Sequence, residues 1–254
     1  MKNIKGKVVC ITSSKGGVGK SIFATNLAGI LENMKKKTLL IDMDLSSGGI
    51  SVLLNLEKAK TIYNLADDIL NNRFQNSSDY VYNYSSFVDV IPSCKDPRQG
   101  NKIDSKLIEQ IINMYKNNYE VLIIDTNHVT NHATLTAIDV SDTVLYMISD
   151  NPVDLKNSAS MLSILDEFDK KVKVILNLSY RNEKPYFSKF DIKSVIGHNL
   201  DYILPTSMYV ININKFIMEG KILVLNKKLS FKNKSDYELL VKIAENIVGD
   251  KNEK

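Results

Sequence analysis

A glycine-rich heptapeptide at residues 15–21, Lys-Gly-Gly-Val-Gly-Lys-Ser, has the residue types of a phosphate-binding loop. It lies between a short apolar run, Val8 to Ile11, and a helix-like stretch, Ile22 to Leu31. The pattern Gly-x4-Gly-Lys-Ser is complete only if Ser14 stands in for the first glycine. Glycines let the backbone curl so that its N–H groups point at phosphate oxygens, and the helix that follows adds its positive end. The heptapeptide therefore predicts a phosphate site between a strand and a helix.

Two side chains of this loop have a chemistry of their own. Lys20 would reach the β- and γ-phosphates of a nucleotide, and the Ser21 hydroxyl would ligate Mg²⁺. The predicted nucleotide-binding residues of the loop are Lys15, Gly16, Gly17, Val18, Gly19, Lys20, Ser21 and Ile22.

Three aspartates end apolar runs elsewhere in the chain. Asp42 and Asp44 end one run, and Asp125 ends another. Because ligands of doubly wound folds bind beyond the carboxyl ends of the strands, all three carboxylates should converge on the nucleotide. Hydrolysis of a nucleoside triphosphate needs Mg²⁺ and a positioned water. We predict that Asp44 holds the water and that Asp125 and Asp42 bind the Mg²⁺ shell through water.

The elements that must position these groups follow from the apolar pattern. Most short apolar runs are continuous rather than alternating, as in strands buried on both faces of a parallel sheet. The predicted strands are 7–13, 38–44, 87–93, 121–126, 143–149, 172–179 and 201–205. Apolar residues recur at helical spacing in 107–115, 152–168, 191–198 and 237–248, with Asp104 or Ser105 as a cap and Gly249 as a stop.

Alternation of strands and helices predicts an α/β fold, with a doubly wound, mostly parallel sheet of about seven strands and helices on both faces. This is the architecture of phosphate-loop NTPases. We find no internal repeat and no linker, so we expect a single domain over residues 1–254. Residues 71–86 and 180–190 are rich in polar and aromatic side chains and are predicted to be surface loops.

Composition and charge are those of an ordinary globular protein. Hydrophobic residues make up 44% of the chain and charged residues 24%, and the net charge of +4 is mild. The only arginines are Arg73, Arg98 and Arg181, so sequence-specific base readout is not suggested. Cys10 and Cys94 lie in separate segments and are expected to be reduced thiols. Without a signal peptide or an apolar run long enough to span a bilayer, the cytoplasm is the expected location.

With its leading lysine, the heptapeptide resembles the deviant Walker A phosphate loop of the MinD/ParA family of ATPases. Residues 39–56 resemble the second strand and first switch of that family, where Asp44 matches the aspartate that orients the attacking water. Residues 121–126 resemble the Walker B strand, with Asp125 at the position of the second-switch aspartate. The resemblance implies an ATPase that uses ATP and Mg²⁺, turns over slowly and is stimulated by a partner.

This resemblance implies a role for Lys15. In the family, two subunits face each other across paired nucleotides, and the signature lysine reaches into the partner's site. Lys15 is therefore expected to act catalytically with Lys20 and Asp44, as an arginine finger does in other phosphate-loop enzymes. The resemblance implies a homodimer that forms on ATP binding.

The nucleotide base is expected to be adenine. Guanine sites of related GTPases use Asn-Lys-x-Asp, whereas this chain has Asn177-Leu178-Ser179-Tyr180 at the corresponding place, with no aspartate. Asn177 matches the family asparagine that contacts adenine. Pro205 follows the last predicted strand, where many members have Pro-x-Asp, although here Thr206 and Ser207 come next.

The second switch departs from the family pattern. After Asp125 many members have Pro and Gly, but this chain has Thr126-Asn127-His128-Val129-Thr130. His128 and His132 are four residues apart, but no carboxylate or cysteine accompanies them at the spacing of a zinc site. This switch is therefore expected to move differently from that of other members.

Residues 42–69 look most like the CpaE/TadZ branch, which helps to place pilus and secretion machinery. The predicted function is thus an ATP-dependent dimerising switch that positions or recruits such machinery through a protein partner. The alternatives are a MinD-like regulator of the division or flagellum site, a ParA-like DNA partition ATPase, and a metabolic enzyme such as a dethiobiotin-synthetase-like ligase. Five lysines, at 221, 227, 228, 232 and 234, would form the DNA-binding patch of the second alternative. Peripheral contact with the membrane or the cell pole is left open.

Overall fold

The computed structural model describes residues 6–56, 59–178, 186–205 and 213–249. Eight strands form one sheet in the order β3-β4-β2-β5-β1-β6-β7-β8. Every neighbouring pair is parallel except β3 and β4. The strands are β1 (Lys7–Thr12), β2 (Thr38–Met43), β3 (Tyr82–Asn83), β4 (Val88–Ile91), β5 (Val121–Thr126), β6 (Thr143–Ile148), β7 (Lys171–Asn177) and β8 (Tyr202–Leu204).

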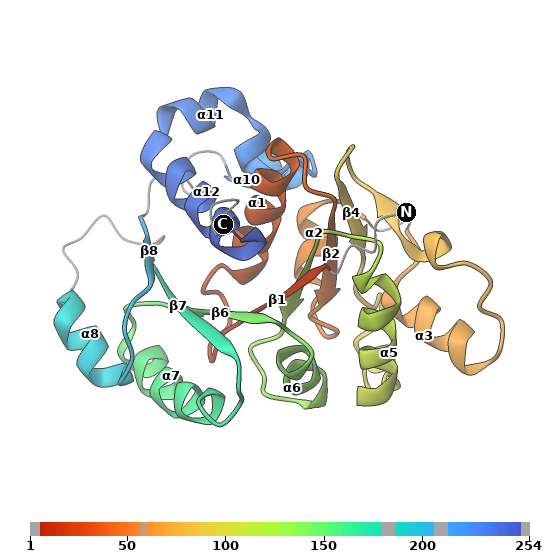
Figure 1. The fold of residues 1–254 in the computed structure, drawn as a ribbon, viewed down its shortest axis with the longest axis horizontal. Helices are drawn as coiled ribbons and strands as arrows, with labels where there is room; N and C mark the ends of the chain where they lie inside the picture. The colour runs from red at the N-terminus through yellow and green to blue at the C-terminus, as the bar shows by residue number, and fades with distance from the viewer. Residues whose placement is uncertain (1–5, 57–58, 179–185, 206–212, 250–254) are drawn as a thin grey trace.

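Helices connect the strands and cover both faces of the sheet (Figure 1). The α-helices are α1 (Lys20–Asn33), α2 (Gly49–Leu53), α3 (Ile62–Leu70), α4 (Pro97–Gly100), α5 (Ser105–Lys116), α6 (His132–Asp139), α7 (Pro152–Leu165), α8 (Lys189–Ile196), α10 (Ile213–Met218), α11 (Lys227–Lys232) and α12 (Lys234–Val248). Two short 3₁₀ helices, η1 (Ser77–Tyr80) and η2 (Leu223–Leu225), complete the described part. No helix in that part is both long and apolar enough to span a membrane.

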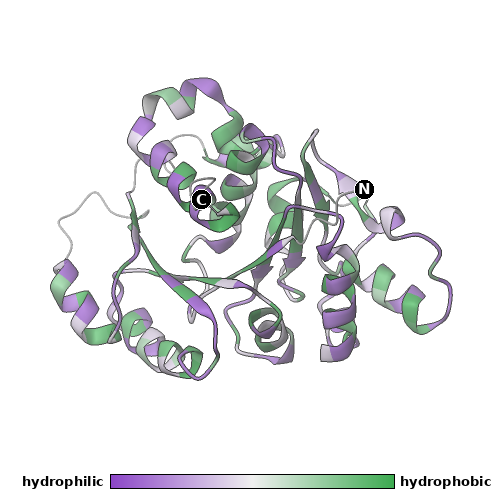
Figure 2. Ribbon diagram, viewed as in Figure 1, coloured by the Kyte–Doolittle hydropathy of each residue, from purple (hydrophilic) through white to green (hydrophobic). Residues whose placement is uncertain are grey.

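The core has one layer on each face of the sheet. Apolar side chains of α5, α6 and α7 pack on one face, and those of α1, η2 and α12 pack on the other. Figure 2 shows the consequence, with hydrophobic central strands between helices whose outer faces are hydrophilic. Every residue of β2 and β5 is buried, as their continuous apolar runs predict. The predicted doubly wound α/β fold is confirmed.

Two predicted helix ends also agree with the structure. Asp104 caps α5 by accepting a hydrogen bond from the Leu107 N–H at 2.8 Å. Gly249, with a φ of 80°, ends α12. Cys10 is buried and Cys94 half-buried, and both are free thiols.

Residues 71–86 were wrongly expected to be only a surface loop. They contain η1 and β3, the eighth strand, which pairs antiparallel with β4. Tyr80 is buried, stacks on Phe74 and donates a hydrogen bond to Asp68 at 2.7 Å. A strand of two residues is too short to leave an alternating pattern in the sequence. Most of the other predicted loop, 180–190, lies outside the described residues, and α8 begins within its end.

Candidate functional site

The heptapeptide forms the connection from β1 to α1, at the carboxyl edge of the sheet. Gly17 and Gly19 adopt φ values of 77° and 96°, which favour glycine. Gly19 is also the N-cap of α1, and a β-carbon there would lie 2.7 Å from Asn177 Nδ2. No side chain caps α1, so the main-chain N–H groups of its first turn and the helix dipole favour an anion.

Lys20 is buried at the start of α1, with 8% of its surface exposed. Its Nζ donates a hydrogen bond to Ser13 Oγ at 2.8 Å, and no described carboxylate forms a salt bridge with it. Burial lowers the pKa of Lys20, while the negative charges of Asp125 and Asp44 oppose that shift. A bound phosphate would place a negative charge within hydrogen-bonding distance of Lys20, which no described carboxylate does.

Asp125 and Asp42 end the neighbouring strands β5 and β2 and stand opposite each other in the sheet register. Both are fully buried. Burial is the main cause that raises the pKa of each carboxyl, to about 8 for Asp125 and about 7 for Asp42. Two buried carboxylates side by side are costly unless a cation compensates them.

The two carboxylates differ in their partners. Asp42 accepts hydrogen bonds from the Ser51 N–H at 2.9 Å and the Ser51 hydroxyl at 2.8 Å. Both oxygens of Asp125 lack a hydrogen-bond partner at bonding geometry among the described residues. A β-carbon built on Gly49 would lie 2.3 Å from Ser21 Oγ and 3.7 Å from Asp125 Oδ2. The Ser21 hydroxyl and the unpaired carboxylate thus face a common point, an oxygen-donor set that fits Mg²⁺.

Asp44 lies in the turn between β2 and α2. Its side chain accepts hydrogen bonds from the N–H groups of Ser46 and Ser47, at 3.3 and 3.1 Å. Its carbonyl accepts one from Ser93 Oγ at 2.7 Å, and the Ser93 N–H donates to Ser51 Oγ at 3.0 Å. Ser51 and Ser93 therefore anchor this turn to β2 and to the end of β4, a role that the sequence did not indicate.

Two adjoining cavities lie over the loop. The larger, of about 500 Å³, is lined by seven of the predicted residues, namely Gly16, Gly17, Gly19, Lys20, Ser21, Ile22 and Asp44. The smaller, of about 180 Å³, is lined by Lys15, Gly16, Gly17, Val18 and Asn177 together with 149–151 and Leu178. Lys15 thus lines the smaller cavity, away from Lys20. Among the predicted residues, Pro205 lines neither cavity.

Asn177 ends β7 and contacts the loop directly. Its Nδ2 donates a hydrogen bond to the Val18 carbonyl at 2.7 Å. Its Oδ1 is buried and has no described partner. An acceptor of this kind, at the edge of the smaller cavity, is available to an amino group of a bound base.

Asp154 on α7 is a fully buried residue that sequence reasoning did not single out. It accepts hydrogen bonds from Ser14 Oγ at 3.0 Å and from the N–H and hydroxyl of Ser149 at 2.6 and 2.8 Å. Ser14, in place of the first glycine, thereby ties the head of the loop to α7. Ser13 Oγ adds a hydrogen bond to the Lys15 carbonyl at 2.8 Å. The only signal in the sequence was the polar turn before this helix.

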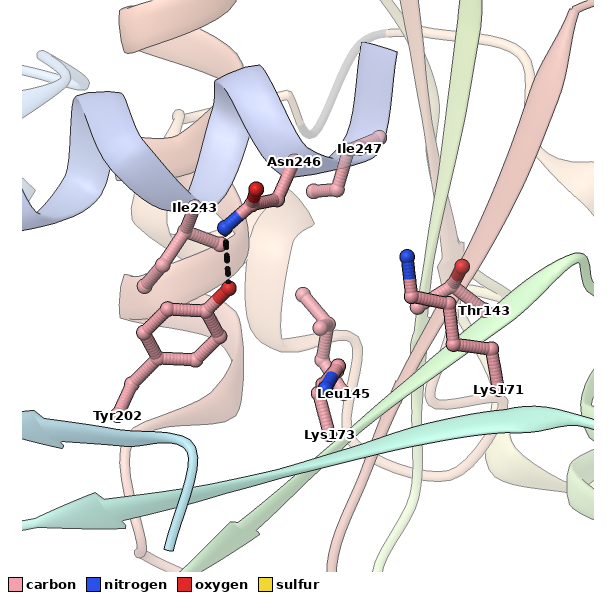
Figure 3. A pocket seen from close by; sticks show the side chains of 8 residues that line it. All are labelled: Thr143, Leu145, Lys171, Lys173, Tyr202, Ile243, Asn246 and Ile247. Carbon is pink, nitrogen blue, oxygen red and sulfur yellow. Dashed lines mark hydrogen bonds between the residues drawn. The ribbon is translucent and has the colours of Figure 1, made fainter. Parts of the chain in front are cut away.

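Another cavity of about 180 Å³ lies beneath the end of α12 and is lined by Lys171, Lys173, Tyr202 and Asn246, where Asn246 Nδ2 donates a hydrogen bond to Tyr202 Oη at 2.7 Å (Figure 3). Its strand residues begin β6, β7 and β8 rather than end them. It therefore opens at the edge of the sheet opposite the phosphate-binding loop.

Comparison with known proteins places this site in a family. The AAA-domain family profile matches residues 6–179. An uncharacterized ATP-binding protein of Methanocaldococcus jannaschii is 29% identical over 61% of this chain and 59% of its own length. A putative septum site-determining protein MinD of Emiliania huxleyi is 24% identical over 88% of this chain and 82% of its own.

Two solved structures share the fold. The ParA family ATPase of Chlorobium tepidum superposes with a TM-score of 0.80, at 20% identity, over 94% of this chain and 98% of that one. The septum site-determining protein MinD of Pyrococcus horikoshii, solved with Mg-ADP, gives a TM-score of 0.77, at 21% identity, over 95% and 96%. The chain therefore belongs to the AAA-domain family, and it is similar in sequence to MinD and in fold to MinD and ParA proteins, as its motifs predicted.

Proposed function

We propose that this protein is an ATP-dependent dimerising switch that hydrolyses ATP slowly and positions or recruits other cellular machinery. The observation that carries the proposal is the larger cavity, which brings together the glycine loop, Lys20 and Asp44 above the unpaired carboxylate of Asp125. The related MinD of Pyrococcus horikoshii was solved with Mg-ADP, which supports ATP and Mg²⁺ as the ligands here.

Each residue of the site has a distinct task in this proposal. The main chain of Gly16 to Gly19 and the start of α1 bind the phosphates, and Lys20 neutralises the β- and γ-phosphates. Ser21 and Asp125 would hold Mg²⁺, and Asp42 lies beside Asp125 in the sheet. When bound, Mg²⁺ would neutralise charge that develops on the transferred phosphoryl group.

Asp44 and the base-contacting residue complete the site. The Asp44 carboxylate orients the attacking water, so hydrolysis needs it and binding does not. Asn177 offers its free Oδ1 to the adenine amino group, while its Nδ2 remains on the Val18 carbonyl. Because Pro205 lines neither cavity, any contact of Pro205 with adenine would come from outside the cavity walls.

The branch of the family is proposed from the sequence of residues 42–69, which favours CpaE/TadZ-like placement of pilus or secretion machinery. A second candidate, regulation of a division or flagellum site, is favoured by relatives described as MinD and as the antiactivator FleN. A ParA-like DNA contact has less support, because Lys221 and Lys234 of the basic patch pair with Glu219 and Glu238.

The dimerising switch is tested with Asp44→Ala. This variant should bind ATP with nearly unchanged affinity, hydrolyse it far more slowly and accumulate as an ATP-bound dimer. Light scattering after size exclusion, with ATP and with ADP, measures the mass, and calorimetry measures binding. Ser46→Ala, in the same turn, is the control and should behave like the wild type. If the wild type dimerises with ATP but Asp44→Ala binds ATP and stays a monomer, Asp44 does not have this role.

A further inference from the structure

The turn after β5 places a histidine ring over the phosphate-binding loop. His128 lines the larger cavity together with Lys20, Ser21 and Asp44. A β-carbon built on Gly16 would lie 3.4 Å from both Cε1 and Nδ1 of the imidazole. The ring therefore rests against the main chain of Gly16, on the wall of the cavity where phosphates would bind.

The turn itself is held in place. The buried Asn127 accepts hydrogen bonds at its Oδ1 from the N–H of His128 at 2.6 Å and of Val129 at 3.3 Å. Thr126 Oγ1 donates to the Ile11 carbonyl at 3.0 Å, which joins the turn to β1. These contacts hold the main chain of the turn, while the ring nitrogens of His128 make no hydrogen bond to a described residue.

The charges around the larger cavity favour a second hydrogen-bond donor to a bound triphosphate, besides Lys20. Its described lining has Lys20 as a cation and Asp44 as an anion. The buried Asp125 lies near Gly49 of this lining, with Asp42 beside it in the sheet. Lys15 lines the neighbouring cavity instead. A terminal phosphate would bring further negative charge close to these carboxylates, so that a hydrogen-bond donor on the facing wall stabilises the bound triphosphate.

We propose that the His128 imidazole donates a hydrogen bond to the γ-phosphate of bound ATP and so makes the turn after β5 discriminate ATP from ADP. The inference rests on the proposed function, because it assumes that the larger cavity holds the phosphates. ADP lacks the group that the ring would meet. The turn leads directly into α6, which begins at His132.

Calorimetry with Mg²⁺ and either ADP or a non-hydrolysable ATP analogue tests the proposal without relying on turnover. His128→Ala should weaken analogue binding by about tenfold or more, as for the loss of a charge-assisted hydrogen bond, and leave ADP affinity within about twofold. His132→Ala is the matched control, because it removes an exposed imidazole four residues away, outside the lining of the cavity, and should change neither affinity. His128→Gln, which keeps an N–H donor, is a second variant and should show a smaller loss of discrimination.

The outcomes separate this inference from the proposed function. If the wild type binds both nucleotides and the ratio of their affinities is unchanged in His128→Ala, the role of His128 is overturned and the ATPase assignment stands. Equal weakening of both nucleotides would also overturn it, because the ring would then support the loop and not recognise the γ-phosphate. If the wild type binds neither nucleotide with Mg²⁺, the proposed function and the role of His128 are overturned together.

Discussion

At the scale of single residues, the site contains a buried lysine and a buried aspartate that form no salt bridge with a described residue. Lys20 is buried and bonded only to the neutral hydroxyl of Ser13 among its described contacts, and Asp125 is buried with neither oxygen at hydrogen-bonding geometry to a described residue. Each group is costly in isolation and is stabilised by a ligand of opposite charge. Binding of the phosphate and Mg²⁺ would therefore offset the free-energy cost of burying Lys20 and Asp125.

Gly49 tests the Mg²⁺ position. In Gly49→Ala the new β-carbon would lie 2.3 Å from Ser21 Oγ and 3.0 Å from Ser21 Cβ, so that the serine must move. We expect the gain in ATP affinity that Mg²⁺ provides to fall by about tenfold, the effect of displacing a ligand or its support. Calorimetry with Mg²⁺ and with a chelator measures this gain.

Lys20→Ala is the contrasting variant in that experiment. It removes a phosphate contact and not a metal ligand, so ATP binding should weaken in both conditions, by tens to hundreds of fold for about 2–3 kcal/mol. If Mg²⁺ raises the ATP affinity of Gly49→Ala as much as that of the wild type, the ion binds elsewhere.

At the scale of elements, the phosphate-binding loop is held from three directions. β1 and α1 carry its ends, Asn177 at the end of β7 bonds to Val18, and Asp154 on α7 bonds to Ser14. Two of these anchors come from parts of the chain far beyond the motif. The conformation of the loop is thus a property of the sheet and α7 as much as of the glycines.

The Asp154 anchor can be removed without touching the loop. Asp154→Ala would leave the Ser149 N–H and the Ser14 hydroxyl without their buried acceptor, at a cost of about 1–3 kcal/mol of unfolding free energy. For a chain of this size that corresponds to a fall in Tm of about 2–4 °C per kcal/mol. Thermal denaturation measures the fall, and ATP affinity should weaken as well because the loop is loosened.

Asp154→Asn is the control for this anchor. Its amide keeps an oxygen that can accept from Ser149, and its NH₂ group can donate to the Ser14 hydroxyl, so the loss of stability should be smaller than in Asp154→Ala. A Tm for Asp154→Ala equal to that of the wild type would show that this network contributes no stability.

At the scale of the whole molecule, the proposal requires two copies of the chain. Lys15 lines the smaller cavity and not the wall that holds Lys20. In a two-fold symmetric dimer the same side chain of one protomer could meet the γ-phosphate of its partner. Dimerisation would then complete the catalytic site, and the oligomeric state of the protein would depend on which nucleotide is bound.

Mixing two inactive variants tests this arrangement. Lys15→Gln should bind ATP almost normally as a monomer but lose ATP-driven dimerisation and hydrolysis, since a finger of this kind is worth ~10³-fold or more in fast systems. In a mixed dimer with Asp44→Ala, the site with an intact Asp44 belongs to the Lys15→Gln protomer and receives its lysine from the partner. Phosphate release should therefore recover partly in the mixture.

The control for the mixture is each variant alone at the same total concentration, which should remain inactive. Native mass spectrometry can establish that mixed dimers form. Mixed dimers without any recovered hydrolysis would mean that Lys15 does not act across the interface.

The sequence by itself determined the features that are local. Continuous apolar runs predicted seven of the eight strands, because burial on both faces of a parallel sheet demands them. The spacing of glycines, Lys20 and Ser21 predicted the loop, because its backbone geometry depends on adjacent residues. The ends of β2 and β5 predicted the meeting of Asp42 and Asp125, because parallel strands bring their carboxyl ends to one edge.

Only the tertiary structure decided which side chains support that loop. Ser14 and Asp154 are 140 residues apart in the chain, and Val18 and Asn177 are 159 apart, yet each pair forms a hydrogen bond. The close approach of Gly49 to Ser21 and of His128 to Gly16 is likewise invisible in the sequence. No local pattern encodes such pairs, because they depend on the order of the strands in the sheet and on the packing of α7 and the switch turns against it.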